Sequence, residues 1–112
     1  MAGKEPLPRE QVEQALTGLP DWRYDGGGLA TVFKAPTAAA ALELIAAVGR
    51  LAEDQNHHPD LDWRYNRVFI RYSSHDAGGQ VTGRDLAAAA GASEAAAAKG
   101  AVAEPARYVR GR

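Results

Sequence analysis

The stretch TAAAALELIAAVGRLAEDQNHHPDLDWRYNRVFIRY, residues 37–72, predicts a helix followed by a β-hairpin. Thr37 is a favourable N-cap residue, and an apolar stripe then recurs at helical spacing over four turns. The helix should run to about Asp54, because Pro59 keeps the residue before it out of helical geometry. The stripe consists of Ala41, Leu44, Ile45, Val48, Leu51 and Ala52.

The second half of this stretch alternates apolar and polar residues, as strands with one buried face do. The alternation predicts one strand over residues 61–65 and another over residues 68–72, with a turn at residues 66–67. Trp63 and Tyr65 are interpreted as core or interface residues, because their alternation alone explains them.

The residues before this stretch predict a helix and a first hairpin. Residues 8–19 carry one apolar stripe at helical spacing, and Pro20 ends that helix. A short strand over residues 22–24, a glycine turn at residues 26–28 and a returning strand over residues 29–35 complete the hairpin.

The residues after the second hairpin predict a loop and a last helix. Thr82 is a candidate N-cap, and Asp85 follows at the third position, as in a capping box. The helix is expected over residues 83–98. Alanine supplies 11 of the 18 residues from Leu86 to Ala103, so this helix should pack thinly.

The order helix, hairpin, helix, hairpin, helix predicts an α+β fold. Two antiparallel hairpins would form a four-stranded antiparallel sheet with the helices packed on one face. A chain of 112 residues fits a single domain. That domain is expected over residues 8–103, with flexible termini at residues 1–7 and 104–112.

Composition excludes several classes of function. The 13 basic and 14 acidic residues nearly cancel, so we expect no nucleic-acid partner. The longest apolar stretch, Ala38–Val48, contains Glu43 and is too short to span a bilayer, and the N-terminus lacks the apolar core of a signal peptide. We therefore expect a cytoplasmic protein with no membrane partner. The absence of cysteine excludes disulfides and thiolate catalysis.

Three histidines, His57, His58 and His75, fall at the ends of adjacent predicted elements. Histidine changes its charge near neutral pH, so a cluster of three indicates proton transfer or metal binding. Glu53 lies one helical turn before His57, and Asp85 opens the last helix, where it can orient a histidine. The alternative interpretation is three unrelated surface histidines beside turns.

Two other chemistries fit the residues less well. Three histidines and a carboxylate suit zinc or iron, but adjacent histidines seldom bind one ion together, and the chain has no H-x-H or H-x-x-x-H pair. Ser73 or Ser74 beside His75 lacks the strand–turn–helix context of a nucleophile elbow. We therefore expect a site without metal or cofactor.

Residue types and spacings together carry a resemblance to a known family. The pattern consists of Glu53, His57-His58-Pro59, Tyr65, His75 and Asp85, together with the phrases at residues 62–68 and 74–79. The sequence resembles the pterin-4a-carbinolamine dehydratase (4a-hydroxytetrahydrobiopterin dehydratase) family. It departs from the family in a longer loop at residues 78–84, in Leu61 at a position where relatives often have isoleucine or a larger aromatic residue, and in the alanine-rich last helix.

The resemblance implies dehydration of 4a-hydroxytetrahydropterin to quinonoid dihydropterin, a lyase reaction that recycles the pterin of aromatic amino acid hydroxylases. It implies that His57 and His75 transfer protons, and that His58 orients the pterin and shares the base role. Glu53 and Asp85 are the residues expected to hold the histidine tautomers. The residues expected to line the pterin are Pro59 and, through their backbone groups, Ser74, Asp76 and Ala77.

Two other functions stay open at this point: a non-catalytic binding or assembly module on the same fold, and a metal-dependent enzyme built on the histidines. The resemblance also implies a homo-dimer or tetramer. The aromatic residues of the chain favour association too, because they offer more surface than thin helices should cover. These residues are Trp22, Trp63, Phe69 and Tyr72.

Overall fold

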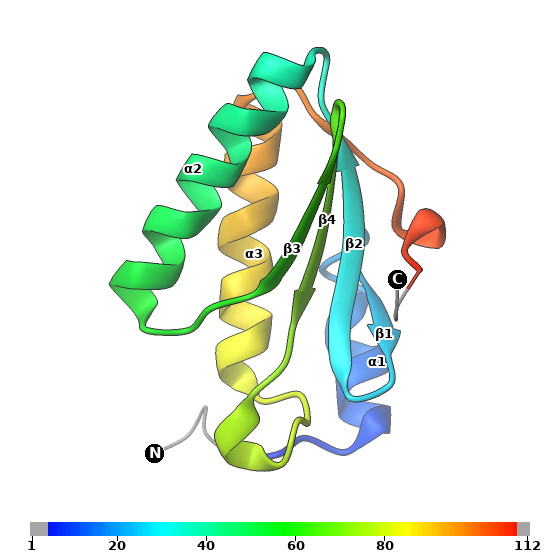
Figure 1. Cartoon of the computed structure of the whole chain (residues 1–112). Coiled ribbons are helices and arrows are strands. Elements are labelled where there is room, and N and C mark those ends of the chain that lie inside the picture. Colours follow the sequence, from blue (N-terminus) through cyan, green and yellow to red (C-terminus); the bar gives the residue numbers. More distant parts are fainter. Residues whose placement is uncertain (1–4, 110–112) are drawn as a thin grey trace.

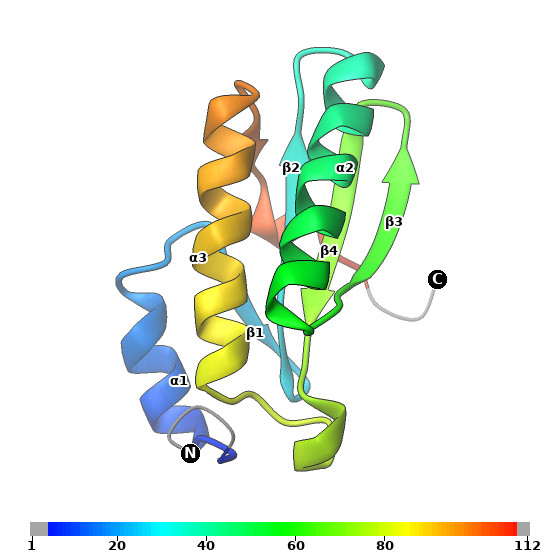
Figure 2. The ribbon, with the colours of Figure 1, turned by 90° about the vertical axis from the view of Figure 1, so that its left-hand side faces the viewer.

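The computed structural model describes residues 5–109, and it shows one antiparallel sheet with three α-helices on one face (Figures 1 and 2). The predicted α+β class and the predicted order of helices and hairpins are confirmed. The elements are α1 (Arg9–Leu16), β1 (Arg23–Asp25), β2 (Gly28–Lys34), α2 (Ala38–Gln55), β3 (Asp60–Arg64), β4 (Arg67–Tyr72), the 3-10 turn η1 (His75–Ala77), α3 (Gly83–Ala98), β5 (Val102–Ala103) and the 3-10 turn η2 (Pro105–Arg107).

The sheet has the strand order β1-β2-β4-β3, and all of its pairs are antiparallel. The long pair β2–β4 forms its centre, with Leu29 opposite Tyr72 and Phe33 opposite Val68. A fifth strand, β5, pairs with the end of β2. The sequence did not predict β5, because a strand of two residues leaves no readable alternation.

Helix α2 begins and ends where its capping residues place it. The Thr37 side chain accepts a hydrogen bond from the Ala40 amide at 3.0 Å, as an N-cap does. Asn56 then adopts a left-handed conformation with φ of 50°, and the His57 amide donates to the Ala52 carbonyl at 3.0 Å. This C-cap turns the chain sharply, so His57 and His58 leave the helix in different directions.

The second hairpin turns at Tyr65-Asn66, so the predicted turn at residues 66–67 was wrong by one residue. Tyr65 has φ of 54°, and the Asn66 side-chain amide fastens the turn by donating to the Ala35 carbonyl at 2.9 Å. Trp63 and Tyr65 are not core residues, since they are 48% and 78% exposed. The reason is that Trp63 lies on the edge strand β3 and Tyr65 lies in the turn.

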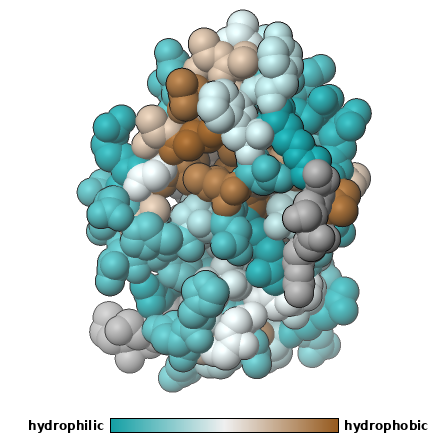
Figure 3. Space-filling view, in the orientation of Figure 1, coloured by the Kyte–Doolittle hydropathy of each residue, from teal (hydrophilic) through white to brown (hydrophobic). Residues whose placement is uncertain are grey.

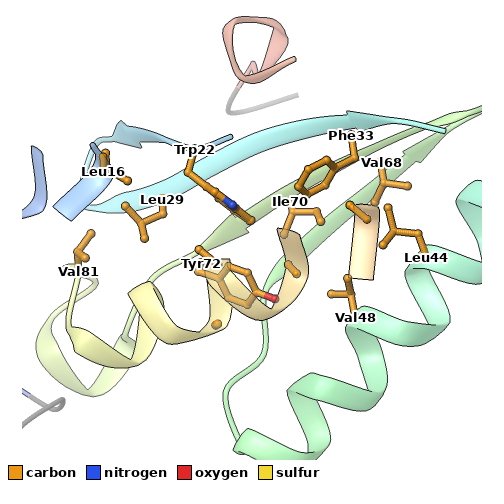
Figure 4. Close-up of a cluster of buried hydrophobic side chains, with 14 of the residues drawn as sticks. Leu16, Trp22, Leu29, Phe33, Leu44, Val48, Val68, Ile70, Tyr72 and Val81 are labelled. Carbon is orange, nitrogen blue, oxygen red and sulfur yellow. The ribbon is translucent and has the colours of Figure 1, made fainter. Parts of the chain in front are cut away.

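The hydrophobic core lies between the sheet and the helices (Figure 4). Trp22 contacts the rings of Phe33 and Tyr72, with centroids 6.0 and 5.6 Å apart, and its indole donates to Ser93 Oγ at 2.8 Å. The expectation that Trp22, Phe69 and Tyr72 need a partner subunit is therefore wrong, because the chain buries all three itself. The alanines of α3 that face the core are Ala88, Ala89, Ala92 and Ala96.

The C-terminal segment covers part of the other face of the sheet, opposite the helices (Figure 1). The Glu104 amide donates to the Val32 carbonyl at 2.7 Å, and the Tyr108 ring lies 6.2 Å from the Phe69 ring. Arg67 Nε donates to Glu104 Oε1 at 2.9 Å, and this hydrogen bond lowers the pKa of Glu104.

These contacts differ from the expectation of flexible termini. Glu104 and Tyr108 contact the sheet, and near the other end the Leu7 amide donates to the Val81 carbonyl at 2.8 Å. The remaining terminal residues, 1–4 and 110–112, lie outside the described residues. Between residues 5 and 109, no helix is long and apolar enough to cross a membrane.

The Tyr108–Phe69 contact predicts that the C-terminal segment stabilises the fold. Replacing Tyr108 with alanine should lower the free energy of unfolding by about 1 kcal/mol, the scale of an aromatic pair. Chemical denaturation of both proteins would measure this difference. Tyr65→Ala is the matched control, because Tyr65 is 78% exposed and should give almost no change. Equal changes in the two variants would contradict a stabilising contact.

Candidate active site

A cavity of about 460 Å³ lies where the end of α2, the end of β4, η1 and the start of α3 meet. These elements lie toward the same end of the molecule in Figure 2. All three histidines line the cavity, so the predicted clustering of His57, His58 and His75 is present in the structure. The complete lining consists of Asn56, His57, His58, Pro59, Asp60, Ser73, His75, Asp76 and Arg84.

His57 is held by a fully buried carboxylate. Its Nε2 lies 2.6 Å from Oδ1 of Asp85, and the ring is itself buried. Because an ionised carboxylate can only accept hydrogen bonds, Nε2 carries the proton of this contact. Nδ1 of His57 has no hydrogen-bond partner among residues 5–109. The Asp85 contact therefore orients the ring and leaves its second nitrogen available.

Asp85 is satisfied by two further donors. Its Oδ2 accepts from the Ser74 hydroxyl and from the Thr82 amide, each at 2.8 Å. The Thr82 contact is half of the capping box that begins α3, as the sequence predicted. The same carboxylate thus starts a helix, fixes the loop after β4 and holds His57.

His58 and Glu53 form a second pair at the surface. Nε2 of His58 lies 2.7 Å from Oε2 of Glu53, and both side chains are exposed. The sequence placed Glu53 beside His57, one helical turn away. Glu53 contacts His58 instead, because the left-handed Asn56 ends the helix before His57 and turns the two histidines apart.

His75 lies in η1 and is exposed. Its ring makes no hydrogen bond with residues 5–109. Of the residues expected to line a pterin, Pro59 and Asp76 line the cavity, whereas Ser74 and Ala77 are not among its lining residues. Ser74 is buried and bonds Asp85, so its side chain supports the site from behind.

Tyr72, for which the sequence predicted no part in a site, contacts His57 from outside the cavity lining. Its ring stacks on the His57 ring at a centroid distance of 6.1 Å and an interplanar angle of 10°. Burial, and then the negative charge of Asp85, raises the pKa of Tyr72 to about 12. Tyr72 is therefore a neutral ring near pH 7, and it restrains His57 without exchanging protons with it.

Arg84 is the second residue that the sequence analysis missed. It lines the cavity, and its guanidinium reaches both the Asn56 carbonyl and the Asp76 carboxylate. No motif in the sequence singles it out, because its contacts reach 8 and 28 residues back along the chain, beyond the range of a local pattern.

The arrangement suits proton transfer. Among residues 5–109, no group of three histidine or carboxylate side chains is placed to hold a metal ion. Instead, each of two histidines is paired with its own carboxylate, and the third faces solvent in the same cavity. Imidazoles in such positions can act as general acids and bases on one bound molecule.

The sequence matches a family of known proteins. The family described as pterin 4 alpha carbinolamine dehydratase matches residues 5–95. A Nocardia farcinica protein, provisionally named a pterin-4-alpha-carbinolamine dehydratase, is 42% identical over 82 residues, covering 73% of this chain and 85% of that protein. A Streptomyces coelicolor protein with the same provisional name is 35% identical over 97 residues, covering 87% and 96% of the two chains.

A solved structure agrees with the sequence relatives. The transcriptional coactivator/pterin dehydratase of Brucella melitensis has a TM-score of 0.76 and 28% sequence identity, covering 81% of this chain and 98% of its own. The family match covers most of this chain, including all three cavity histidines and Asp85. The chain therefore belongs to the pterin-4-alpha-carbinolamine dehydratase family.

Proposed function

We propose that this protein dehydrates a 4a-hydroxytetrahydropterin to the quinonoid dihydropterin and so recycles a pterin cofactor. Family membership supports the reaction class. The observation that carries the proposal is the convergence of three histidines on one cavity, with His57 held by the buried Asp85.

The reaction needs two proton transfers. The C4a–O bond breaks, and the hydroxyl takes up a proton and leaves as water. N5 loses a proton, and its electron pair forms the double bond between C4a and N5. Positioned acids and bases accelerate such steps by roughly 10²–10⁴-fold. The step requires neither a redox partner nor a covalent intermediate.

The surroundings of each histidine suggest its role. We assign the base to His57, since the Asp85 carboxylate stabilises the positive charge that arises when Nδ1 accepts the N5 proton. His75 is exposed to solvent, from which it can regain a proton, so it acts as the acid that protonates the hydroxyl. His58 is steadied by Glu53 at the cavity rim and orients the pterin.

A dehydratase assay on freshly generated 4a-hydroxytetrahydropterin tests the function. The purified protein should accelerate the loss of water, with equal rates before and after prolonged treatment with a chelator. Activity that chelation removes and one metal ion restores would favour a metal-dependent enzyme. A rate equal to that of the uncatalysed reaction would favour a non-catalytic module. The similar Brucella protein is named a coactivator as well as a dehydratase, which is the kind of role such a module would have.

Alanine variants should separate catalysis from binding. His57→Ala and His75→Ala should lower kcat by about 10²-fold or more, with smaller changes in pterin affinity. His58→Ala should weaken binding more than it slows turnover. Steady-state kinetics, with direct titration of a stable dihydropterin, would measure both quantities. Small and equal effects in all three variants would show that the cavity is not the site.

The pH dependence should tell base from acid. A base must be unprotonated and an acid protonated, so kcat/KM of the parent protein should fall at both low and high pH. In His57→Ala, kcat/KM should no longer fall at low pH, and in His75→Ala it should no longer fall at high pH. In both variants the highest value of kcat/KM should be lower than in the parent protein. The opposite assignment of the two limbs would reverse the proposed roles.

We also propose that the protein forms a homo-oligomer, a dimer at least. Strand β3 is an edge of the sheet, and its Leu61 and Trp63 are 40% and 48% exposed. Figure 3 shows an exposed hydrophobic patch over the region between α2 and β3. Apolar surface beside an unpaired strand favours association, because a partner covers both.

A charge on this edge should weaken the oligomer. Light scattering at several concentrations should give at least twice the mass of the chain, and Leu61→Lys should shift that mass toward the monomer. Val102→Lys is the control, because Val102 is 65% exposed on β5, at the other side of the sheet. A parent protein that stays monomeric at high concentration would refute the proposal.

A further inference from the structure

Arg84 joins the two turns that carry the proposed base and acid. Its Nη2 donates to the Asn56 carbonyl at 2.8 Å, and its Nη1 donates to Oδ2 of Asp76 at 3.3 Å. Asn56 directly precedes His57, and Asp76 directly follows His75. One guanidinium therefore spans the space between the two sides of the cavity.

Inside the protein, Asp85 already links the two turns through His57 and Ser74, and Arg84 adds a link at the cavity rim. Asn56 is the left-handed cap of α2, and carbonyls at a helix end lack partners within the helix. The turn η1 has only three residues, and His75 and Asp76 are both exposed. A planar guanidinium presents its donors in a rigid fork, so two contacts from one arginine fix a separation as well as an orientation.

The support behind Arg84 is rigid. Arg84 lies in the first turn of α3, whose next residue, Asp85, bonds His57 inside the protein. Neighbouring residues of a helix point in different directions, so Asp85 reaches the interior while Arg84 reaches the cavity rim. The inward alanines Ala88 and Ala89 pack α3 against the core, so the helix that carries Arg84 is anchored separately from the two turns.

From this geometry we infer that Arg84 is a positioning residue, which at the cavity rim sets the spacing between the His57 turn and the His75 turn, in addition to the link through Asp85 inside the protein. The inference rests on the proposed function for its kinetic consequence. A dehydration that needs a base and an acid on one pterin depends on that spacing, and a misplacement of about 1 Å can cost roughly 10²-fold in rate. Stability should depend on Arg84 much less, because the Asp76 carboxylate of its ion pair is 61% exposed and ion pairs at the surface contribute little.

Four variants test this role: Arg84→Gln, Arg84→Lys, Asp76→Asn and the double variant Arg84→Gln/Asp76→Asn. We expect Arg84→Gln to lower kcat by roughly 10- to 100-fold with a smaller change in KM. Lysine should restore little, because a single ammonium cannot span both contacts. The double variant should be no slower than Arg84→Gln alone, since both changes remove the same link.

A readout without substrate separates this inference from the proposed function. The amides of Ala77, Gly78 and Gly79 donate to carbonyls of Ser74 and His75 within the η1 turn. Hydrogen exchange at these amides should become roughly tenfold faster in Arg84→Gln, because the turn opens more often. If the parent protein proved not to be a dehydratase, this acceleration would still support the link between the turns.

The control is Arg64→Gln. Arg64 likewise pairs with an exposed carboxylate, Asp62, at 2.8 Å, but on β3 and away from the cavity lining. It should leave both kcat and η1 exchange unchanged. Unchanged η1 exchange in Arg84→Gln would overturn the inference. So would kinetic effects of Arg84→Gln and Asp76→Asn that simply add, which would mean that Arg84 acts on the substrate alone.

Discussion

The site depends on one buried carboxylate and on the donors that it requires. Asp85 is fully buried, and an ionised carboxylate without partners in a protein interior costs several kcal/mol. Its three donors are His57 after α2, Ser74 after β4 and the Thr82 amide before α3. Satisfying Asp85 therefore brings three distant segments together, and the histidine cavity is formed where they meet.

Local patterns predicted the elements well, because caps, stripes and alternation act within a few residues. Thr37 caps α2 as expected, and the Thr82–Asp85 capping box begins α3. The prediction failed where one residue in a left-handed conformation decides direction. Asn56 at φ of 50° moved the contact of Glu53 from His57 to His58, and Tyr65 at φ of 54° moved the hairpin turn by one residue.

The clustering of the histidines could be predicted from the sequence, whereas the residues that surround and hold them could not. The spacing of His57, His58, His75 and Asp85 indicated a shared site, and the structure places the three histidines around one cavity with Asp85 behind it. Tyr72 and Arg84 could not be found this way. Their contacts are a stacked ring and hydrogen bonds between residues 8 and 28 positions apart, which no local pattern records. The prediction that aromatic residues need a partner subunit failed for a similar reason. Trp22 and Phe69 are buried by segments distant in sequence, which a local pattern does not show.

Strand β4 has side chains on both faces of the sheet. It therefore contacts the C-terminal segment on one face and His57 on the other. Successive strand residues point to opposite faces, so Phe69 meets Tyr108 on the outer face, whereas Tyr72 stacks on His57 on the helix face. The family match ends at residue 95, before β5 and the segment that carries Tyr108. This segment covers Phe69 and holds Arg67 through Glu104, which fixes β4 from behind. Because β4 is packed on both faces, its end is held in place. The Tyr72 ring therefore stays against His57, and Ser74, two residues further on, stays within hydrogen-bond distance of Asp85.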